Sequence, residues 1–443
     1  MFVILGDRWR ATLLTAAVLL AASASAGAVP VAAPAGTTGS AVLAGLPISA
    51  PQFVGTVEEF YEVPQPLPPG VPGELIRVQD VGSSGGRTTV RIMYHSTDPA
   101  GRDRAVTGIA TVPDASPPPG GWPVVSIANG TVGLASNCAL SRHGWPAPTF
   151  GIDAIAVASD YIGLGPVGER HPYLSRTSEG NSVIDAVRAV RNLMGDAADD
   201  RWLVVGASQG GHGSLSAAEL AAARAPELEL LGAVSLAPAA MLERTYGPID
   251  EIVARVVGVM ALYGAETEHP QIDANDYVGP QTAAAAAAVF PDQCLPAIIA
   301  AFAPIPAEDF YVADPRVTEP ARSLMLANDV GNATFDAPLL LGASTADEIV
   351  VIERARDLAV RVCTTGQHTQ YVEVDGALHG EVMGAFGDRI TAFFTARLDG
   401  APAPDNCDEV LATHAVPPPP PPPVSTASPQ AAVPAATGPA FTG

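Results

Sequence analysis

The segment GASQG at residues 206–210 constrains the fold of this chain more than any other part of the sequence. It comes directly after a short apolar run at residues 202–206 and just before a helical pattern at residues 213–223. G-x-S-x-G between a buried strand and a helix is typical of a nucleophile elbow, a strained turn that exposes a serine hydroxyl at the edge of a sheet. Glycine is needed on both sides because a Cβ atom there would collide with the neighbouring chain. The pattern predicts Ser208 as a nucleophile; the alternative is a tight glycine-rich turn around a buried serine.

The chain around this segment alternates between strand-like and helix-like patterns. Short apolar runs bounded by turn residues predict buried strands, and the amphipathic stretches between them predict helices. The strands are expected at residues 88–94, 105–112, 123–128, 152–158, 202–206, 230–236, 338–342 and 369–374, and the helices at 181–194, 213–223, 352–362 and 380–397. Such alternation indicates an α/β fold with a mostly parallel central sheet that helices cover on both faces.

Residues 238–336 interrupt this alternation. They contain an alanine run at residues 283–288, scattered prolines and no convincing strand. We expect a helical insertion there, so that the sheet domain comprises residues 52–237 and 337–415.

The two ends of the chain differ in composition from the middle. Two arginines precede an apolar run at residues 11–22, and small residues follow at residues 24–26, which predicts a signal peptide over residues 1–26 and a secreted protein. A membrane anchor is the weaker alternative, because a span needs about 20 apolar residues. Residues 27–51 have the composition of a low-complexity linker, and residues 416–443 that of a proline-rich disordered tail.

The cysteines fit an oxidising compartment. Cys138, Cys294, Cys363 and Cys407 lie far apart and form no CxxC pair, which disfavours zinc binding and dithiol redox chemistry. In a secreted chain two disulfides are the simpler interpretation. Four cysteines allow three pairings, and the sequence does not choose among them.

The charge balance excludes some classes of partner. The chain has 46 acidic residues against 23 basic ones, none of them Lys, and a net charge of -23 at pH 7. A nucleic-acid partner requires a basic surface, and docking on anionic lipid through charge alone would be repulsive. We therefore expect no nucleic-acid partner and no obligate protein partner, while transient contact with a lipid interface stays open.

A serine nucleophile needs a base and an acid that orients the base, and after an elbow of this kind the acid comes before the histidine in the chain. Asp347 follows a predicted strand, and its neighbour Glu348, with a longer side chain, is the rival. Of the three later histidines, His379 follows the last strand and opens the final helix. His368 precedes that strand, at its wrong end, and His414 lies beside the proline-rich tail. The sequence predicts Asp347 and His379; a surface histidine that caps the helix is the alternative for His379.

An oxyanion hole takes one amide from the residue after the nucleophile and another from the loop after an earlier strand. The first is Gln209. The loop after residues 123–128 begins Asn129-Gly130-Thr131, which makes Thr131 the candidate for the second amide, an ordinary glycine-rich turn being the alternative. His212, one helical turn after Ser208, is expected as a packed histidine rather than a second base.

Several short segments carry a resemblance when they are taken together. They are Asn129-Gly-Thr with Cys138 shortly after it, SDYIGLG at residues 159–165, GASQGG at 206–211, TADE at 345–348 and LHG at 378–380. In this order they resemble the secretory lipase family, the lipase A type of α/β-hydrolase, over about residues 55–410. Relatives commonly have His before the Gly-Thr, where this chain has Asn129.

The resemblance implies an α/β-hydrolase fold and a secreted carboxylic ester hydrolase that acts on acyl glycerols, with Ser208, Asp347 and His379 as its triad. It implies that residues 238–336 form a helical cap, or lid, around an acyl tunnel. It also implies disulfides between Cys138 and Cys294 and between Cys363 and Cys407.

The residues and the resemblance together predict a lipase or esterase that cleaves acyl glycerols or related acyl esters through an acyl-enzyme intermediate. No step of this chemistry needs a metal or an organic cofactor. Two alternatives stay open: an acyltransferase that uses the same triad, and a non-catalytic cell-envelope binding protein, for which the proline-rich tail is the only support.

Overall fold

A nine-stranded sheet forms the centre of the computed structural model, which describes residues 51–245 and 251–414. The strands are β1 (Leu75–Ser84), β2 (Arg87–Thr97), β3 (Asp103–Pro113), β4 (Trp122–Ala128), β5 (Ile155–Ser159), β6 (Ala198–Ala207), β7 (Glu229–Leu236), β8 (Leu339–Ser344) and β9 (Thr369–Val374). Their order is β1-β2-β3-β5-β4-β6-β7-β8-β9. The pairs β1–β2, β2–β3 and β3–β5 are antiparallel and the others parallel. The predicted signal peptide, the proline-rich tail and nearly all of the predicted linker lie outside the described residues.

The prediction of a mostly parallel sheet is confirmed, and each expected strand is present. β1 was not predicted from the sequence. Among the nine strands it pairs with β2 alone, at the edge of the sheet, apart from an isolated bridge between Val78 and Gln52, and most of its residues are half-buried or exposed. An edge strand of this kind lacks the continuous apolar run that identifies a buried strand.

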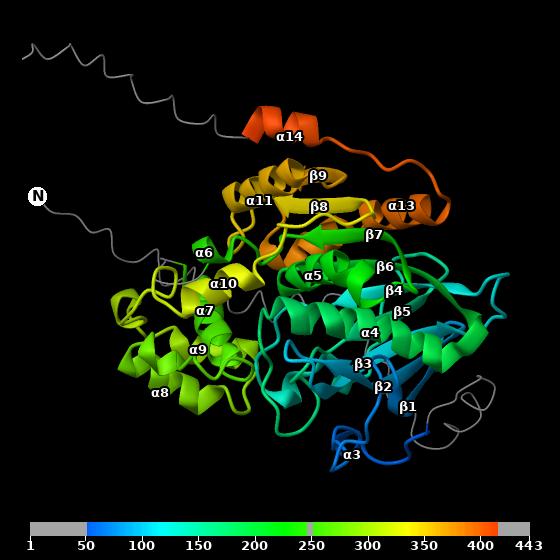
Figure 1. Ribbon diagram of the computed structural model, residues 1–443, viewed down its shortest axis with the longest axis horizontal. Helices are drawn as coiled ribbons and strands as arrows, with labels where there is room; N and C mark the ends of the chain where they lie inside the picture. The colour runs from blue at the N-terminus through cyan, green and yellow to red at the C-terminus, as the bar shows by residue number, and fades with distance from the viewer. Residues whose placement is uncertain (1–50, 246–250, 415–443) are drawn as a thin grey trace, which may run out of the picture.

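Helices cover both faces of the sheet, as Figure 1 shows. On one face lie α4 (Arg176–Met194), α5 (Gln209–Arg224) and α11 (Ile352–Thr365), and on the other α12 (Val382–Ala385) and α13 (Gly387–Leu398). The single helix expected at residues 380–397 was wrong, because the chain forms a 3-10 turn at His379–Glu381 and then these two helices. Three glycines, Gly380, Gly384 and Gly387, lower the helix propensity of the segment, and the buried ring of Phe386 anchors the break between the helices.

The segment between β7 and β8, here called the insertion, lies to one side of the sheet (Figure 1). Its described residues form the helices α6 (Leu242–Thr245), α7 (Ile252–Ala265), α8 (Pro280–Val289), α9 (Leu295–Phe302) and α10 (Ala321–Asn328), and no strand. These helices share an apolar core of their own, in which Tyr263, Phe290, Phe302 and Phe310 follow one another in ring contact. The insertion is therefore a second packed unit beside the sheet.

Two disulfides tie the elements together. Cys138, in the loop after β4, is bonded to Cys294 at the start of α9, and Cys363 of α11 is bonded to Cys407, the first residue of α14 (Cys407–His414). These are the two pairs that the resemblance implies. In the described ranges, no helix is both long and apolar enough to cross a membrane.

Candidate active site

Ser208 stands between β6 and α5 in a strained backbone conformation, with φ 60° and ψ -121°. Its two flanking glycines are required by space. A Cβ atom on Gly206 would lie 2.0 Å from the carbonyl oxygen of Gly210, and one on Gly210 would lie 2.1 Å from that of Ala128. The chain therefore makes the sharp turn of a nucleophile elbow, with the serine at the N-terminus of a 16-residue helix.

Asp347 and His379 are brought together from the loops that follow β8 and β9. The Nδ1 atom of His379 lies 2.8 Å from Oδ2 and 3.0 Å from Oδ1 of Asp347. Main-chain amides of Ile349 and Val350 donate to Oδ1 at 2.9 and 2.8 Å, which fixes the carboxylate. The carboxylate is buried, while the imidazole is 10% exposed.

Glu348, the rival acid, binds His379 at a different atom. Its Oε2 accepts a hydrogen bond from the main-chain amide of His379 at 3.0 Å, not from the ring. The other two candidate histidines lie elsewhere: the His368 ring hydrogen-bonds the carbonyl of Ala403, and the ring of His414 packs edge-on against Tyr371.

The loop after β4 carries Asn129 and Thr131. The side chain of Asn129 is turned into the fold, where Nδ2 donates to the main-chain carbonyl of Ser159 at 2.8 Å. The main-chain carbonyl of Asn129 accepts from the Tyr161 hydroxyl at 2.8 Å. The hydroxyls of Thr131 and Tyr173 are 2.8 Å apart. Asn129 thus fixes the loop on its neighbours, and Thr131 is left at the edge of the site.

Ser208, His379, Thr131 and Asn129 all line one cavity of about 730 Å³. Its walls are mainly apolar. They come from the insertion (Val253, Val257, Leu295 and Ile299), from the loop at residues 145–150 (Trp145 and Phe150 among others) and from α12 (Met383). None of the described residues that line it is Asp, Glu or Arg.

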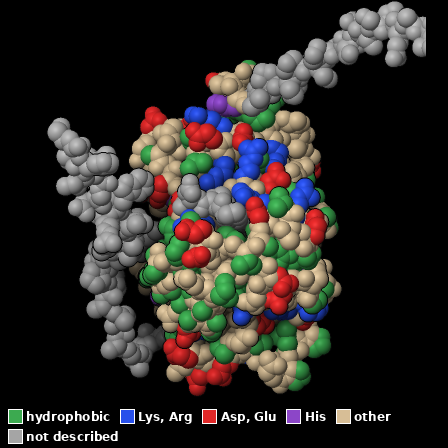
Figure 2. Space-filling view, turned by 90° about the vertical axis from the view of Figure 1, so that its left-hand side faces the viewer, with side chains coloured by type: hydrophobic (Ala, Val, Ile, Leu, Met, Phe, Trp, Pro, Cys, Tyr) green, Lys and Arg blue, Asp and Glu red, His purple; other side chains and the backbone are tan. Residues whose placement is uncertain are grey.

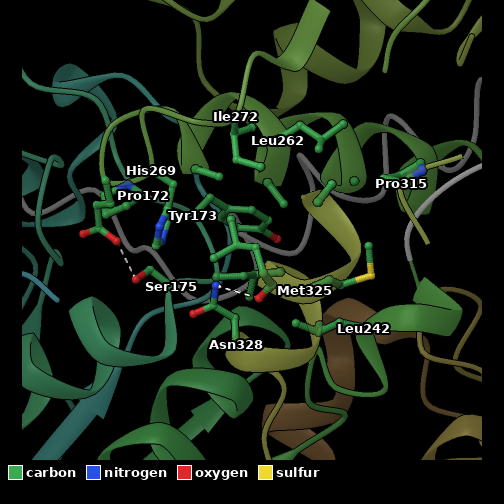
Figure 3. A pocket seen from close by; sticks show the side chains of 17 residues that line it. Pro172, Tyr173, Ser175, Leu242, Leu262, His269, Ile272, Pro315, Met325 and Asn328 are labelled. Carbon is green, nitrogen blue, oxygen red and sulfur yellow. Dashed lines mark hydrogen bonds between the residues drawn. The ribbon is translucent and has the colours of Figure 1, made fainter. Parts of the chain in front are cut away.

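A second cavity, of about 40 Å³, lies between the insertion and residues 172–175 of the loop before α4 (Figure 3). It is lined by Leu262, Ile272 and Met325, among other apolar side chains, with Asn328 at one edge. Tyr173 lines this cavity as well as the larger one. This residue therefore belongs to the lining of both cavities.

Four buried polar side chains that the sequence analysis did not connect surround the start of α5. Gln209 Nε2 lies 2.7 Å from both His171 Nε2 and Glu179 Oε1, and Glu179 Oε2 lies 2.6 Å from His212 Nδ1. Burial lowers the pKa of His171. Burial also opposes the charged form of His212, but the adjacent Glu179 carboxylate outweighs it and raises the pKa of His212. His212 is packed in the interior, as expected. Gln209 was identified from the sequence because it follows Ser208, but no sequence pattern linked it to His171 or Glu179.

Comparison with known proteins relates this geometry to other hydrolases. The family model for secretory lipase matches residues 153–406. The X-ray structure of Candida antarctica lipase A is similar with a TM-score of 0.66 and 17% identity, over 80% of this chain and 89% of that chain. The rice cell wall degrading esterase LipA from Xanthomonas oryzae has a TM-score of 0.61 and 17% identity, over 75% of this chain and 100% of that chain. No curated protein matches by sequence.

The structural likeness shows an α/β-hydrolase fold. The family model covers more than half of the chain, including Ser208, Asp347 and His379. The chain therefore belongs to the secretory lipase family, whose members are lipase and esterase hydrolases.

Proposed function

We propose that this chain is a secreted serine hydrolase that cleaves neutral carboxylic esters, with Ser208 as nucleophile, His379 as general base and Asp347 as the acid that orients His379. One observation carries this proposal: His379, which is hydrogen-bonded to Asp347, and the strained Ser208 line the same apolar cavity.

The mechanism follows from these positions. Because Asp347 accepts from Nδ1 of His379, the lone pair on Nε2 is free to take the proton of Ser208 as its oxygen attacks the ester carbonyl. The resulting oxyanion accepts from the main-chain amide of Gln209, which is in the first turn of α5 and has no intrahelical acceptor, and from that of Thr131. His379 then protonates the leaving alcohol, and a water molecule releases the acyl group by the same steps.

The residues that line the cavity favour an uncharged substrate. A lining of mainly aliphatic and aromatic side chains favours hydrocarbon, and none of the described lining residues is an arginine that would pair with a carboxylate or phosphate on the substrate. Acyl glycerols and related acyl esters fit this description. The insertion supplies six of the apolar wall residues, which supports its role as a cap over the site.

Export is proposed on independent grounds. Family membership and two disulfides, with no free cysteine among the described residues, support an oxidising destination.

The test is hydrolysis of p-nitrophenyl esters and triglycerides over a series of acyl lengths. Wild type is expected to turn over neutral esters, and Ser208→Ala to lose the activity by a factor on the order of 10⁶. A matched Ser214→Ala variant, which changes a buried serine of the same helix away from the cavity, is expected to keep it. Activity that survives in Ser208→Ala would contradict the triad.

A further inference from the structure

The cluster of buried side chains around the start of α5 has no place in the proton transfers described above. We propose that Glu179 and His171 are positioning residues that hold Gln209 in place, so that its main-chain N–H is aimed at the oxyanion, and that His212 in turn holds Glu179. This inference rests on the proposed function and deepens it.

The hydrogen bonds leave the Gln209 side chain a single orientation. His171 Nδ1 lies 2.8 Å from the carbonyl oxygen of Ile162, which can only accept, so Nδ1 carries the proton and Nε2 is an acceptor. One N–H of the Gln209 amide donates to His171 Nε2 and the other to Glu179 Oε1, both at 2.7 Å. A flipped amide would place its oxygen against a lone pair and a carboxylate.

The oxygen of the Gln209 amide indicates that this side chain does more than stabilise the fold. Gln209 Oε1 is buried and has no hydrogen-bond partner in the part of the chain that the structure describes. A buried acceptor without a partner costs folding free energy. An apolar side chain of similar size would pack here without that cost. A glutamine is needed if the two N–H donors of its amide hold Gln209, the first residue of α5, in place.

Glu179 is itself fixed from several sides. Its Oε1 accepts from the main-chain amide of Leu174 at 3.0 Å, and its Oε2 lies 2.6 Å from His212 Nδ1. His212 Nε2 lies 2.9 Å from the carbonyl oxygen of Asn328. Because both neighbours of the His212 ring accept, both of its nitrogens donate, and the ring is an imidazolium that pairs with the carboxylate.

The cluster joins parts of the chain that are distant in sequence. Glu179 belongs to α4, Gln209 and His212 to α5, and His171 to the loop before α4, while Asn328 is the last residue of α10 in the insertion and borders the second cavity (Figure 3). The side chains of Glu179, His171 and His212 are fully buried. The first turn of α5 therefore cannot shift without breaking contacts to α4 and to the insertion.

Two substitutions of Glu179 distinguish the effect of its hydrogen bonds to Gln209 from the effect of its negative charge. Glu179→Ala removes both acceptors. Glu179→Gln keeps an oxygen for Gln209 and Leu174 and presents an N–H to His212, which can become neutral with its proton on Nε2. We expect Glu179→Ala to lower kcat by about 10- to 100-fold with KM changed less than about threefold, because a small displacement of an oxyanion donor affects the transition state most. Glu179→Gln is expected to retain kcat within about threefold.

Asp185→Ala is the matched control. Asp185 is also a fully buried carboxylate of α4, hydrogen-bonded to Ser96, Arg188 and Arg224. Its removal is expected to lower the Tm about as much as Glu179→Ala, but to leave kcat per folded molecule unchanged. If Glu179→Ala does not fold, Gln209→Ala tests the same step, since it keeps the main-chain amide and is expected to lower kcat to a similar extent.

The outcomes are distinguishable. Wild-type kcat per folded molecule in Glu179→Ala and Gln209→Ala would overturn the positioning role, and so would an equal loss in Asp185→Ala. A wild-type protein without esterase activity, or an active Ser208→Ala, would instead overturn the proposed function.

Discussion

Asp347 and Glu348 are adjacent carboxylates that both bind His379, one at the imidazole and the other at the main-chain amide. Only the first contact can hold the ring in the tautomer that accepts a proton from Ser208. We expect Asp347→Asn to lower kcat by about 10³- to 10⁴-fold, because an amide at this position favours the wrong tautomer. Glu348→Gln is the matched control and is expected to cost less than about tenfold. Steady-state kinetics with one short ester decide between them, and a larger loss in Glu348→Gln would reverse the assignment.

Residues of the candidate site were predictable from the sequence where the signal is local. The elbow around Ser208 lies within five residues, and Asp347 and His379 each follow an apolar strand in the order that the chemistry requires. Glu179 and His171 could not be found in this way. Their roles arise only when α4, the loop before it and α5 meet, and no spacing in the sequence encodes that contact.

Tyr173 lines both the cavity that contains Ser208 and the smaller cavity, in which Figure 3 shows it. Tyr173→Ala is expected to join the two cavities and to raise kcat/KM for p-nitrophenyl palmitate relative to the butyrate by about tenfold, since added apolar room favours the longer chain. Tyr173→Phe is the control, because it removes only the hydroxyl that bonds Thr131 and keeps the wall. An unchanged ratio in Tyr173→Ala would show that the ring does not limit chain length.

At the scale of elements, α9 is fastened to the loop that carries Thr131. The Cys138–Cys294 disulfide, a bridge between Gly133 and Cys294, and a 2.8 Å hydrogen bond from the Leu295 amide to the Val132 carbonyl act together at this point. Leu295 also lines the active-site cavity. One clamp therefore positions both the loop that carries Thr131 and a wall of the cavity.

Removing the two disulfides separately tests this clamp. A variant with Cys138→Ser and Cys294→Ser is expected to lose about 2–4 kcal/mol of unfolding free energy and to raise KM severalfold. The variant with Cys363→Ser and Cys407→Ser loses a bridge between α11 and α14, neither of which lines the cavity, so it should lose stability with KM unchanged. Denaturant melts and KM values measure both effects, and equal KM values would argue against the clamp.

Elements were predictable where burial is continuous along the chain. The strands β4 to β8 contain buried apolar runs because helices cover both faces, whereas β1 is half-exposed and shows no such run. Helix α4 begins five residues before its expected start at residue 181. Its first turns are polar yet buried, because Glu179 and Ser178 find partners on α5 and in the insertion, so their burial depends on tertiary contacts.

The whole molecule combines an acidic exterior with an uncharged cavity. The net charge is -23, and only 16% of residues are charged, so neutral side chains occupy much of the surface. On the side where the insertion lies, Figure 2 shows hydrophobic and acidic side chains spread over the face, with arginines gathered in its upper half. We expect the net negative charge of the protein to repel a negatively charged ester as it approaches. None of the described residues that line the cavity is an arginine that would pair with it.

Two esters of equal acyl length test this combination: p-nitrophenyl hexanoate and the p-nitrophenyl half ester of adipic acid, whose chain ends in a carboxylate. We expect kcat/KM for the anionic ester to be lower by about 10- to 100-fold at low ionic strength, after the rate in Ser208→Ala has been subtracted.

Salt separates two causes of this difference. Repulsion between the acidic surface and the approaching anion is long-range and is screened by salt, because the Debye length falls to about 3 Å at 1 M. Added NaCl should therefore reduce the difference in kcat/KM between the two esters. The free-energy cost of burying the carboxylate in the apolar cavity persists at any ionic strength, because no charged partner compensates it there. Equal rates at all salt concentrations would contradict both contributions, and a gap that salt abolishes would leave only the surface charge as the cause.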